Sequence, residues 1–392
     1  MKYDVVIVGA GPAGLSFARS LADTDLNVLI IEKTSEESLA DPATDGRDIA
    51  LTHLSVKLLN EIGVWSQIPS DAISPIKEAR VLDGTSSYFL HFEQKKVSHD
   101  ALGYLVSNHL IRKALYEKLG TLSNIELLPD TSVLSVNSNN QGASVTLSNG
   151  ETIEATLVVA ADSRFSETRR KVGLSASMRD FGQIVLVCRM EHERSHGNIA
   201  YECFHYGRTL AVLPLTGNQS SIVITAPTDR CNEILNLSEE EFNNDISHQF
   251  KGRLGKMKLI GERFPYPLIA VYADKFVSNH FALIGDAAVG MHPVTAHGFN
   301  LGLKGQHTLA REIKTALKRG VDIGSSTVLE SYHSKHRRAS HPLYLATNGI
   351  VRLYNNNEML SARMLRKTML RLGNNIWPVK RAIMNQLTAI EH

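Results

Sequence analysis

Continuous apolar runs at the start of the chain predict strands that are buried on both faces. Residues 3–8 read YDVVIV and residues 28–31 read VLII, without the alternation of a strand that has one wet face. Between these runs, Leu15, Ala18 and Leu21 recur at helical spacing, so one face of a helix is apolar. The pattern predicts a strand, a helix and a second parallel strand.

A glycine-rich turn joins the first strand to the helix. Residues 9–14 read GAGPAG, and Glu32 lies 18 positions after Gly14, at the end of the second strand. Such glycines permit a tight turn and close approach to a pyrophosphate, the helix N-terminus presents amide N–H groups, and the acid accepts hydrogen bonds from ribose hydroxyls. The unit predicts binding of an adenine dinucleotide, without distinguishing NAD from FAD. Its candidate cofactor-binding residues are Gly9, Gly11, Pro12, Ala13, Gly14, Glu32 and Lys33.

Short β-type segments dominate the middle of the chain. Segments 131–136, 143–147 and 152–160 come first, and residues 157–159 are expected to return the chain to the first sheet. From Ile184 onward follow IVLVCRM, IAYECFHY, TLAVLPL and SIVITA, which predict an inserted antiparallel sheet facing the substrate. Within it, Tyr201, Phe204 and Tyr206 either line the substrate cavity or pack inside the sheet.

A second unit of strand, loop and helix lies far along the chain. Residues 281–284 form an apolar strand, followed by Gly285-Asp286 and then by a helix that begins near Gly298 and ends at Gly320. Gly285 is 271 positions beyond Gly14. We expect this unit to bring a distant part of the chain to the same ligand.

Composition narrows the chemistry. Of 392 residues, 43% are apolar and 21% charged, as in soluble globular proteins, and the net charge of +2 disfavours nucleic acid as a partner. The three cysteines lack CxxC spacing, so neither a redox dithiol nor a bound metal is expected. No apolar run reaches 18 residues and residues 1–11 lack a secretion signal, which predicts a cytoplasmic protein whose membrane contact is at most peripheral.

Three motifs in this order resemble the class A flavoprotein hydroxylases, which share the fold of para-hydroxybenzoate hydroxylase. They are GAGPAG with Glu32, Asp162 after an apolar strand, and the distal GDAA…HP…GFNLG. The stretches DGRDIALT from Asp45 and VSNHLIR from Val106 further resemble the UbiH/UbiF-like hydroxylases of ubiquinone biosynthesis, and HPVTAHGFNLGL resembles their UbiM-type branch. Ser163 and Val289 depart from the pattern, since they replace a usual glycine and a frequent histidine.

The resemblance implies an α/β fold with a Rossmann-like FAD-binding domain of the glutathione reductase type. An antiparallel β-sheet substrate domain would be inserted in it, and the C-terminus would be helical. The FAD-binding domain would comprise residues 1–75, 100–178 and 275–335, and the substrate domain residues 76–99 and 179–274. Residues 336–392 would form the helical, basic C-terminal segment.

The resemblance also implies further contacts with FAD. Asp286 would hold the ribityl chain, and helix amides near Gly298 would stabilise negative charge on the reduced flavin. Arg47 would meet the diphosphate or the incoming nicotinamide nucleotide, or is a solvated surface residue, and Val133 passes the adenine or is a core valine. The cofactor-binding candidates added in this way are Arg47, Val133, Asp162, Gly285, Asp286, Gly298, Phe299 and Asn300.

The activity implied is that of an FAD-dependent monooxygenase. NAD(P)H would reduce FAD, dioxygen would add as a flavin C4a-hydroperoxide, and the aromatic ring of a demethoxyubiquinol-like polyprenyl precursor would be hydroxylated. The catalytic candidates near the flavin are His292, Pro293 and His297. Each histidine is either a general base or a hydrogen-bonded structural residue.

The last residues of the chain combine positive charge with apolar side chains. Residues 352–392 carry a balance of 7 − 2 = +5. The segment either rests on the anionic inner face of a membrane, where a polyprenyl phenol or quinol resides, or packs on the core with its charged face solvated. A quinone-biosynthesis complex is a further candidate partner. Two alternatives stay open: hydroxylation of a small soluble phenol, and a non-catalytic FAD-binding component of such a complex.

Overall fold

The computed structural model describes residues 2–83, 89–93, 100–120, 122–205, 207–292 and 297–355. Tyr206, Pro293 and residues 356–392, which hold most of the basic segment, lie outside the described residues. Within the described part, two eight-stranded sheets and one three-stranded sheet form the framework. The mixed α/β architecture predicted from the sequence is confirmed.

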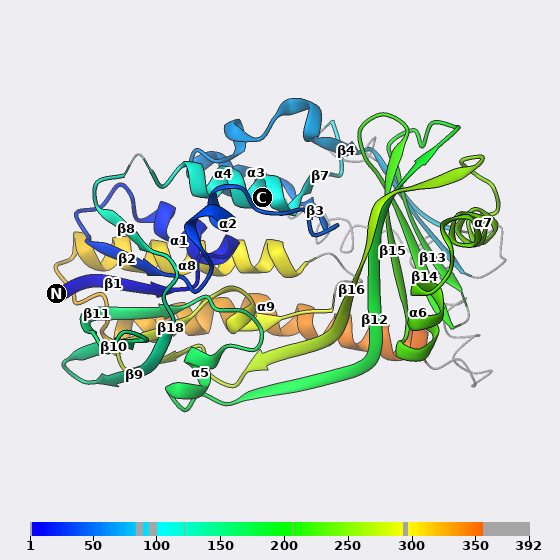
Figure 1. Ribbon diagram of the computed structural model, residues 1–392. Helices are drawn as coiled ribbons and strands as arrows, with labels where there is room; N and C mark the ends of the chain where they lie inside the picture. The colour runs from blue at the N-terminus through cyan, green and yellow to red at the C-terminus, as the bar shows by residue number, and fades with distance from the viewer. Residues whose placement is uncertain are drawn as a thin grey trace.

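The first large sheet contains the predicted dinucleotide-binding unit (Figure 1). Its strand order is β17-β18-β11-β1-β2-β8, and β10 and β9 continue from β11. The pairings β18–β11–β1–β2–β8 are all parallel, which explains the continuous apolar runs, because helices and loops cover both faces. The strands are β1 (Lys2–Val8), β2 (Val28–Ile31), β8 (Ile125–Leu128), β9 (Val133–Asn139), β10 (Gly142–Leu147), β11 (Thr152–Ala160), β17 (Val277–Ser278) and β18 (Phe281–Leu283).

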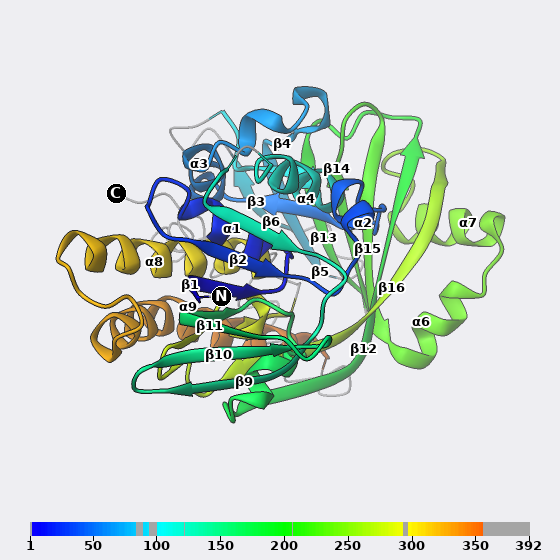
Figure 2. The ribbon, with the colours of Figure 1, turned by 60° about the vertical axis from the view of Figure 1, so that its left-hand side comes forward.

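Helix α8 packs between α1 and α9 beside this sheet (Figures 1 and 2). Ser20 Oγ on α1 donates to Gln306 Oε1 on α8 at 3.0 Å, and Tyr332 on α9 donates its hydroxyl to the backbone oxygen of Leu283 at 2.7 Å. The helices of this layer are α1 (Pro12–Ser20), α2 (Glu36–Ala40), α3 (His53–Glu61), α4 (Asn108–Glu117), α5 (Glu167–Lys171), α8 (Gly298–Lys318) and α9 (Ser326–Asn355), with short 3-10 turns at Trp65–Gln67, Ser70–Ala72 and Gly285–Ala287.

The second large sheet has the order β19-β16-β12-β15-β14-β13-β5-β6. The antiparallel sheet predicted from residue 184 onward is present, but β13 pairs in parallel with β5, which comes from an earlier part of the chain and lies between β13 and the edge strand β6. Helices α6 (Thr228–Leu235) and α7 (Glu239–Gln249) cover the face turned away from the first layer (Figure 1). The strands are β5 (Glu78–Asp83), β6 (Phe89–Glu93), β12 (Ala176–His192), β13 (Ile199–His205), β14 (Arg208–Pro214), β15 (Gln219–Pro227), β16 (Met257–Ala273) and β19 (Val289–Gly290).

Two long strands connect the layers. β12 and β16 each have 17 residues and pair from Ala176↔Ala273 to His192↔Met257, with a register shift between Asp180 and Ile184. A small sheet of β3 (Asp48–Leu51), β7 (Gly103–Ser107) and β4 (Ser74–Ile76) completes the fold. The domain boundaries drawn from the sequence stay predictions.

The corner after β11 tolerates the departure at Ser163. Asp162 Oδ1 accepts from Ser166 Oγ at 2.5 Å, and its Oδ2 accepts from the backbone N–H of Thr168 at 3.0 Å. Ser163 has φ +89°, in the left-handed region where a Cβ is crowded and glycine is not. The serine therefore keeps the turn that glycine usually makes, with some backbone strain.

Replacing Ser163 by glycine should relieve this strain. We expect Ser163→Gly to raise the free energy of unfolding by about 0.5–1 kcal/mol, since the left-handed penalty exceeds the extra entropy of an unfolded glycine. Urea denaturation of the purified protein measures the difference. Ser163→Ala is the control, because it removes the hydroxyl and keeps the Cβ; equal stability of the two variants would contradict the prediction.

Candidate cofactor site

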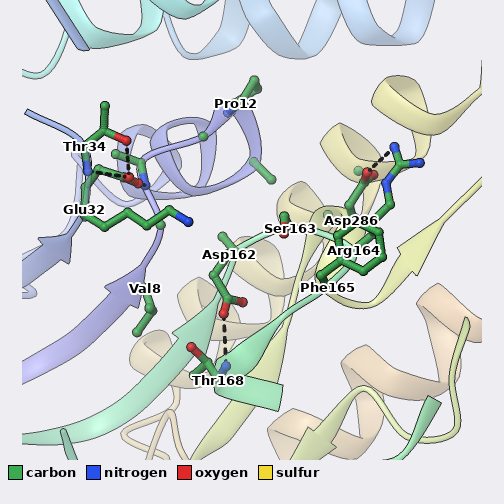
Figure 3. A pocket seen from close by; sticks show the side chains of 18 of the residues that line it. Val8, Pro12, Glu32, Thr34, Asp162, Ser163, Arg164, Phe165, Thr168 and Asp286 are labelled. Carbon is green, nitrogen blue, oxygen red and sulfur yellow. Dashed lines mark hydrogen bonds and ion pairs between the residues drawn. The ribbon is translucent and has the colours of Figure 1, made fainter. Parts of the chain in front are cut away.

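A cavity of about 710 Å³ lies at the carboxyl ends of the parallel strands. Both sequence motifs and the corner after β11 contribute to its wall, so segments far apart along the chain meet there (Figure 3). Of the predicted cofactor-binding residues, those that line it are Gly9, Gly11, Pro12, Ala13, Glu32, Lys33, Arg47, Val133, Asp162, Gly285, Asp286, Gly298 and Phe299. Gly14, Asn300, His292 and His297 do not line it.

The glycines of the first turn have different tasks. A Cβ on Gly14 would lie 2.0 Å from the backbone oxygen of Gly9, so this glycine allows the helix to approach the strand. Gly9 has φ +109°, and a Cβ there would lie 2.7 Å from the backbone oxygen of Ala161. At Gly11 a Cβ would meet nothing within 4 Å. Gly11 therefore leaves room in the cavity, whereas Gly9 and Gly14 are required for backbone packing.

The carboxylate of Glu32 is held in place by the turn itself (Figure 3). Its Oε2 accepts from the backbone N–H of Ala10 at 2.6 Å, and its Oε1 accepts from the N–H and hydroxyl of Thr34 at 3.0 and 2.7 Å. A carboxylate has about four acceptor positions, so one remains for a ribose hydroxyl. The geometry suits the sugar end of a dinucleotide.

Asp286 forms an ion pair that sequence reasoning missed. Its Oδ2 lies 3.1 Å from Nη2 of Arg164 (Figure 3). Nη1 of Arg164 donates to the backbone oxygen of Ile269 at 3.2 Å. Both side chains line the cavity. Its position in the sequence could have indicated that Arg164 belongs to the site, because it lies two residues after the candidate Asp162.

Arg47 is also paired. Its Nη2 lies 2.6 Å from Oδ2 of Asp45, and its guanidinium stacks over the ring of Tyr266 at 5.3 Å. Burial raises the pKa of Asp45, but hydrogen bonds from Arg47 and its charge outweigh burial, so the pKa lies below the usual value. The Arg47 side chain is 46% exposed and lines the cavity, so its guanidinium can still bind a phosphate.

The rim of the cavity carries more cationic than acidic side chains. The cations are Lys33, Arg47, Arg112, Arg164, Arg170 and Lys171, and the acids are Glu32, Asp162, Glu167 and Asp286. This excess favours an anionic group such as a diphosphate. Val133 lies at this rim as well, and its backbone oxygen accepts from Lys171 Nζ.

The side chain of Asn300 bonds to the protein, and its predicted contact with FAD stays a prediction. Its Oδ1 accepts from the N–H of Thr52 at 3.0 Å and from the hydroxyl of Ser55 at 2.6 Å, and its Nδ2 donates to the backbone oxygen of Ala50 at 2.8 Å. These bonds fix the first turn of α8 against β3 and α3. Gly298 and Phe299, in the same turn, do line the cavity, so the positive end of the helix dipole is directed at it.

The two histidines are buried beside the loop that precedes α8. His292 packs edge-on against Phe181 with ring centroids 5.0 Å apart, and burial lowers its pKa to about 4, so the imidazole is neutral at pH 7 and a weak proton acceptor. The backbone oxygen of His297 accepts from the N–H of Leu301 at 2.8 Å. Catalytic roles for both stay predictions, and Pro293 lies outside the described residues.

The aromatic residues of β13 divide between the two faces of the second sheet. Tyr201 packs against Phe250 with ring centroids 5.1 Å apart, inside the cluster beneath α6 and α7. For Tyr201 the interpretation as sheet core is confirmed. Phe204 lies on the opposite face, because three positions separate the two residues.

Among the residues that the structure describes, no group of three or more His, Cys, Asp or Glu side chains could hold a metal ion. In the same residues, no helix combines the length and apolarity needed to cross a membrane.

The residues of the cavity fit FAD. Gly11 leaves open space beside the helix N-terminus, Glu32 retains acceptor capacity for a ribose, the rim is cationic, and the first turn of α8 is directed at the opposite end. These groups correspond in chemistry to the pyrophosphate, the sugar and the reducible ring of a flavin dinucleotide.

Comparison with known proteins agrees with this fit. The family model described as FAD binding domain matches residues 2–344. Ubiquinone hydroxylase UbiM of Neisseria meningitidis is 49% identical over 392 residues, which cover 99% of this chain and 85% of UbiM. Ubiquinone hydroxylase UbiL of Rhodospirillum rubrum is 35% identical over 381 residues, which cover 97% of this chain and 88% of UbiL.

The fold likewise matches solved structures. The p-nitrophenol 4-monooxygenase PnpA from Pseudomonas putida superposes with a TM-score of 0.79 at 19% identity, covering 99% of this chain and 98% of PnpA. At this identity the likeness concerns the fold. Taken with the family model and the identity to UbiM and UbiL along nearly the whole chain, it shows that this enzyme belongs to the FAD-dependent monooxygenases of the FAD binding domain family, in the group of the UbiM- and UbiL-type ubiquinone hydroxylases.

Proposed function

We propose that this enzyme hydroxylates the aromatic ring of a polyprenyl ubiquinone precursor, with NAD(P)H as electron donor and dioxygen as co-substrate. The observation that carries the substrate class is the 49% identity to UbiM, a ubiquinone hydroxylase, over 99% of the chain. The cavity supports the same proposal, since its residues fit the flavin that such chemistry needs. The precursor would resemble demethoxyubiquinol.

The protein contributes binding, orientation and electrostatics. When bound, FAD supplies electron transfer from NAD(P)H and activation of dioxygen. Glu32 holds the ribose, the cationic rim offsets the charge of the diphosphate, and Asp286 orients the chain between diphosphate and ring. The amides at the start of α8, held by Asn300, favour the negative charge of the reduced ring.

The proposal also includes the location of the protein at the inner face of the membrane. A polyprenyl substrate resides in the bilayer, and residues 352–392 carry a net charge of +5, which suits an anionic lipid surface or a partner in a quinone-biosynthesis complex. Support for this part comes from the sequence alone, because nearly the whole segment lies outside the described residues.

Deleting the gene tests the substrate class. In cells without another hydroxylase for the same ring positions, we expect ubiquinone to fall and a polyprenyl intermediate lacking ring oxygen to accumulate, as measured by mass spectrometry of quinone extracts. The wild-type gene on a plasmid should restore ubiquinone. Normal ubiquinone after deletion would contradict the proposal and favour a small soluble phenol.

Filling the space at Gly11 tests the assignment of the cavity. Gly11 has φ −72°, which any residue adopts, and its Cβ would meet nothing, so Gly11→Val should fold normally. Its side chain would occupy the space assigned to the pyrophosphate, and we expect at least about tenfold weaker FAD binding, or 1.4 kcal/mol. Flavin fluorescence titration measures the affinity. Gly120→Val, at another uncrowded glycine away from the cavity, is the matched control; equal affinity of both variants for FAD would place the pyrophosphate elsewhere.

Removing the Asp286 carboxylate tests the contact with the flavin chain. We expect Asp286→Ala to lose FAD while remaining folded. Its partner Arg164 is 28% exposed, and a partly exposed ion pair of this kind contributes at most about 1 kcal/mol to the free energy of unfolding. The absorption spectrum of the purified protein and its circular dichroism report the two properties. Asp23→Ala, which breaks the exposed pair with Lys314, should keep FAD. An unchanged flavin spectrum in Asp286→Ala would remove Asp286 from the site.

A further inference from the structure

One carboxyl group lies on the inner face of the second sheet, and the proposed function has not used it. Residues of β13 alternate between the faces: Tyr201 and Cys203 belong to the cluster beneath α6 and α7. Glu202, between them, therefore points to the opposite face. This is the face turned toward the FAD-binding layer, since α6 and α7 lie on the far side of the sheet (Figure 1).

The strand register confirms which residues share this face. Directly paired residues in a sheet point to the same side. The pairs that cross the sheet through Glu202 form the row Val81, Glu202, Ala211, Val223, Val187 and Phe264. At the end of this row, the ring of Phe264 lies so close to Gly46 that a Cβ there would be 2.4 Å from it. Gly46 precedes Arg47, which lines the cofactor cavity, so one end of the row contacts the segment that borders the cavity, and Glu202 lies farther along the same row.

Neighbouring contacts support the same orientation. In the row on one side, Tyr266 donates its hydroxyl to the backbone oxygen of Asp45 at 2.6 Å. In the row on the other side, Nη2 of Arg189 lies 2.6 Å from Oδ1 of Asp48 on β3. Three adjacent rows thus face the segment that carries Arg47, and Glu202 belongs to the middle one.

Glu202 is the one ionisable side chain in its row. Its neighbours across the strands are Val81 and Ala211, and along the strand it is followed on the same face by Phe204. Within the described residues, no hydrogen bond or ion pair to its carboxyl is found. Burial raises the pKa of Glu202 to about 8. At neutral pH the group is therefore mainly a neutral acid, which both donates and accepts a hydrogen bond.

The position is also accessible. Glu202 keeps intermediate exposure, whereas Tyr201 and Cys203 on either side are buried. The carboxyl thus faces a space between the layers and is not packed inside the sheet. A desolvated acid that lines such a space is costly for folding, and groups of this kind concentrate at functional sites.

We propose that Glu202 is the residue of the second sheet that recognises an oxygen substituent on the substrate ring. Its carboxyl hydrogen-bonds a ring hydroxyl, and the apolar side chains of the same row, from Val81 to Val187, contact the carbon skeleton. The inference rests on the proposed function, because the ligand it names is the phenol or quinol ring of that reaction. A site built to pair a hydroxyl rejects an analogue that lacks one, since its own polar group is then left without a partner.

The test compares two ligands on the FAD-loaded full-length protein: a short-chain 2-prenylphenol and the prenylbenzene that lacks its hydroxyl. Dissociation constants come from the change in flavin fluorescence on titration. We expect the wild type to bind the phenol at least about tenfold more tightly than the prenylbenzene. Glu202→Leu should reduce that ratio to about threefold or less, through loss of affinity for the phenol. Glu202→Gln, which keeps one donor and one acceptor, should fall between the two.

Controls separate recognition from folding. Glu202→Leu replaces a desolvated carboxyl by an apolar side chain, so its midpoint of thermal unfolding should equal or exceed that of the wild type. Glu191→Leu, at an exposed carboxylate of β12 in the same sheet, should leave the ligand ratio unchanged. If Glu202→Leu keeps the wild-type ratio, this inference is overturned alone. If the wild type binds neither ligand and hydroxylates no prenylated phenol, the proposed function is overturned and this inference with it.

Discussion

Three hydrogen bonds of one side chain, that of Asn300, connect parts of the chain that are about 250 residues apart in sequence. They join the first turn of α8 to the end of β3 and the start of α3. Because the same turn contributes Gly298 and Phe299 to the cavity, the position of the helix dipole relative to the cavity depends on these bonds. The strand-turn-helix unit at the N-terminus depends on a different constraint, which is the close approach of helix α1 to the backbone of the turn that Gly14 allows.

Sequence reasoning predicted the elements better than the contacts among them. The first two parallel strands and the second half of β11, residues 157–160, were recognisable because strands covered on both faces carry continuous apolar runs. The parallel pairing of β5 with β13 was not predictable from local pattern, since it depends on where an earlier segment meets the sheet edge. Likewise, the pair between Asp286 and Arg164 joins positions 122 apart, so the position of Arg164 beside Asp162 could indicate that it belongs to the site but not that Asp286 is its partner.

The site shows a similar division. Residues of the glycine-rich turn and of the GD motif do line the cavity, because each motif describes a backbone path that can be read locally. Asn300 belonged to a motif and still points at protein, since a motif does not state which way a side chain in the first helical turn is directed. On β13, side chains alternate between the two faces of the sheet. Tyr201 and Phe204 are three positions apart and lie on opposite faces, and Phe204 shares its face with Glu202.

The long pair of strands β12 and β16 has a mechanical consequence. At about 3.3 Å per residue, each strand would span roughly 55 Å when fully extended. The two paired strands therefore form one continuous ribbon that runs through both layers. Sliding one layer along the other would shear the ladder of hydrogen bonds between these strands, which is interrupted between Asp180 and Ile184 and between Val187 and Arg189. The ribbon therefore resists translation of one layer along the other, and bending is expected where Phe181 and Gly182 pair with neither β15 nor β16.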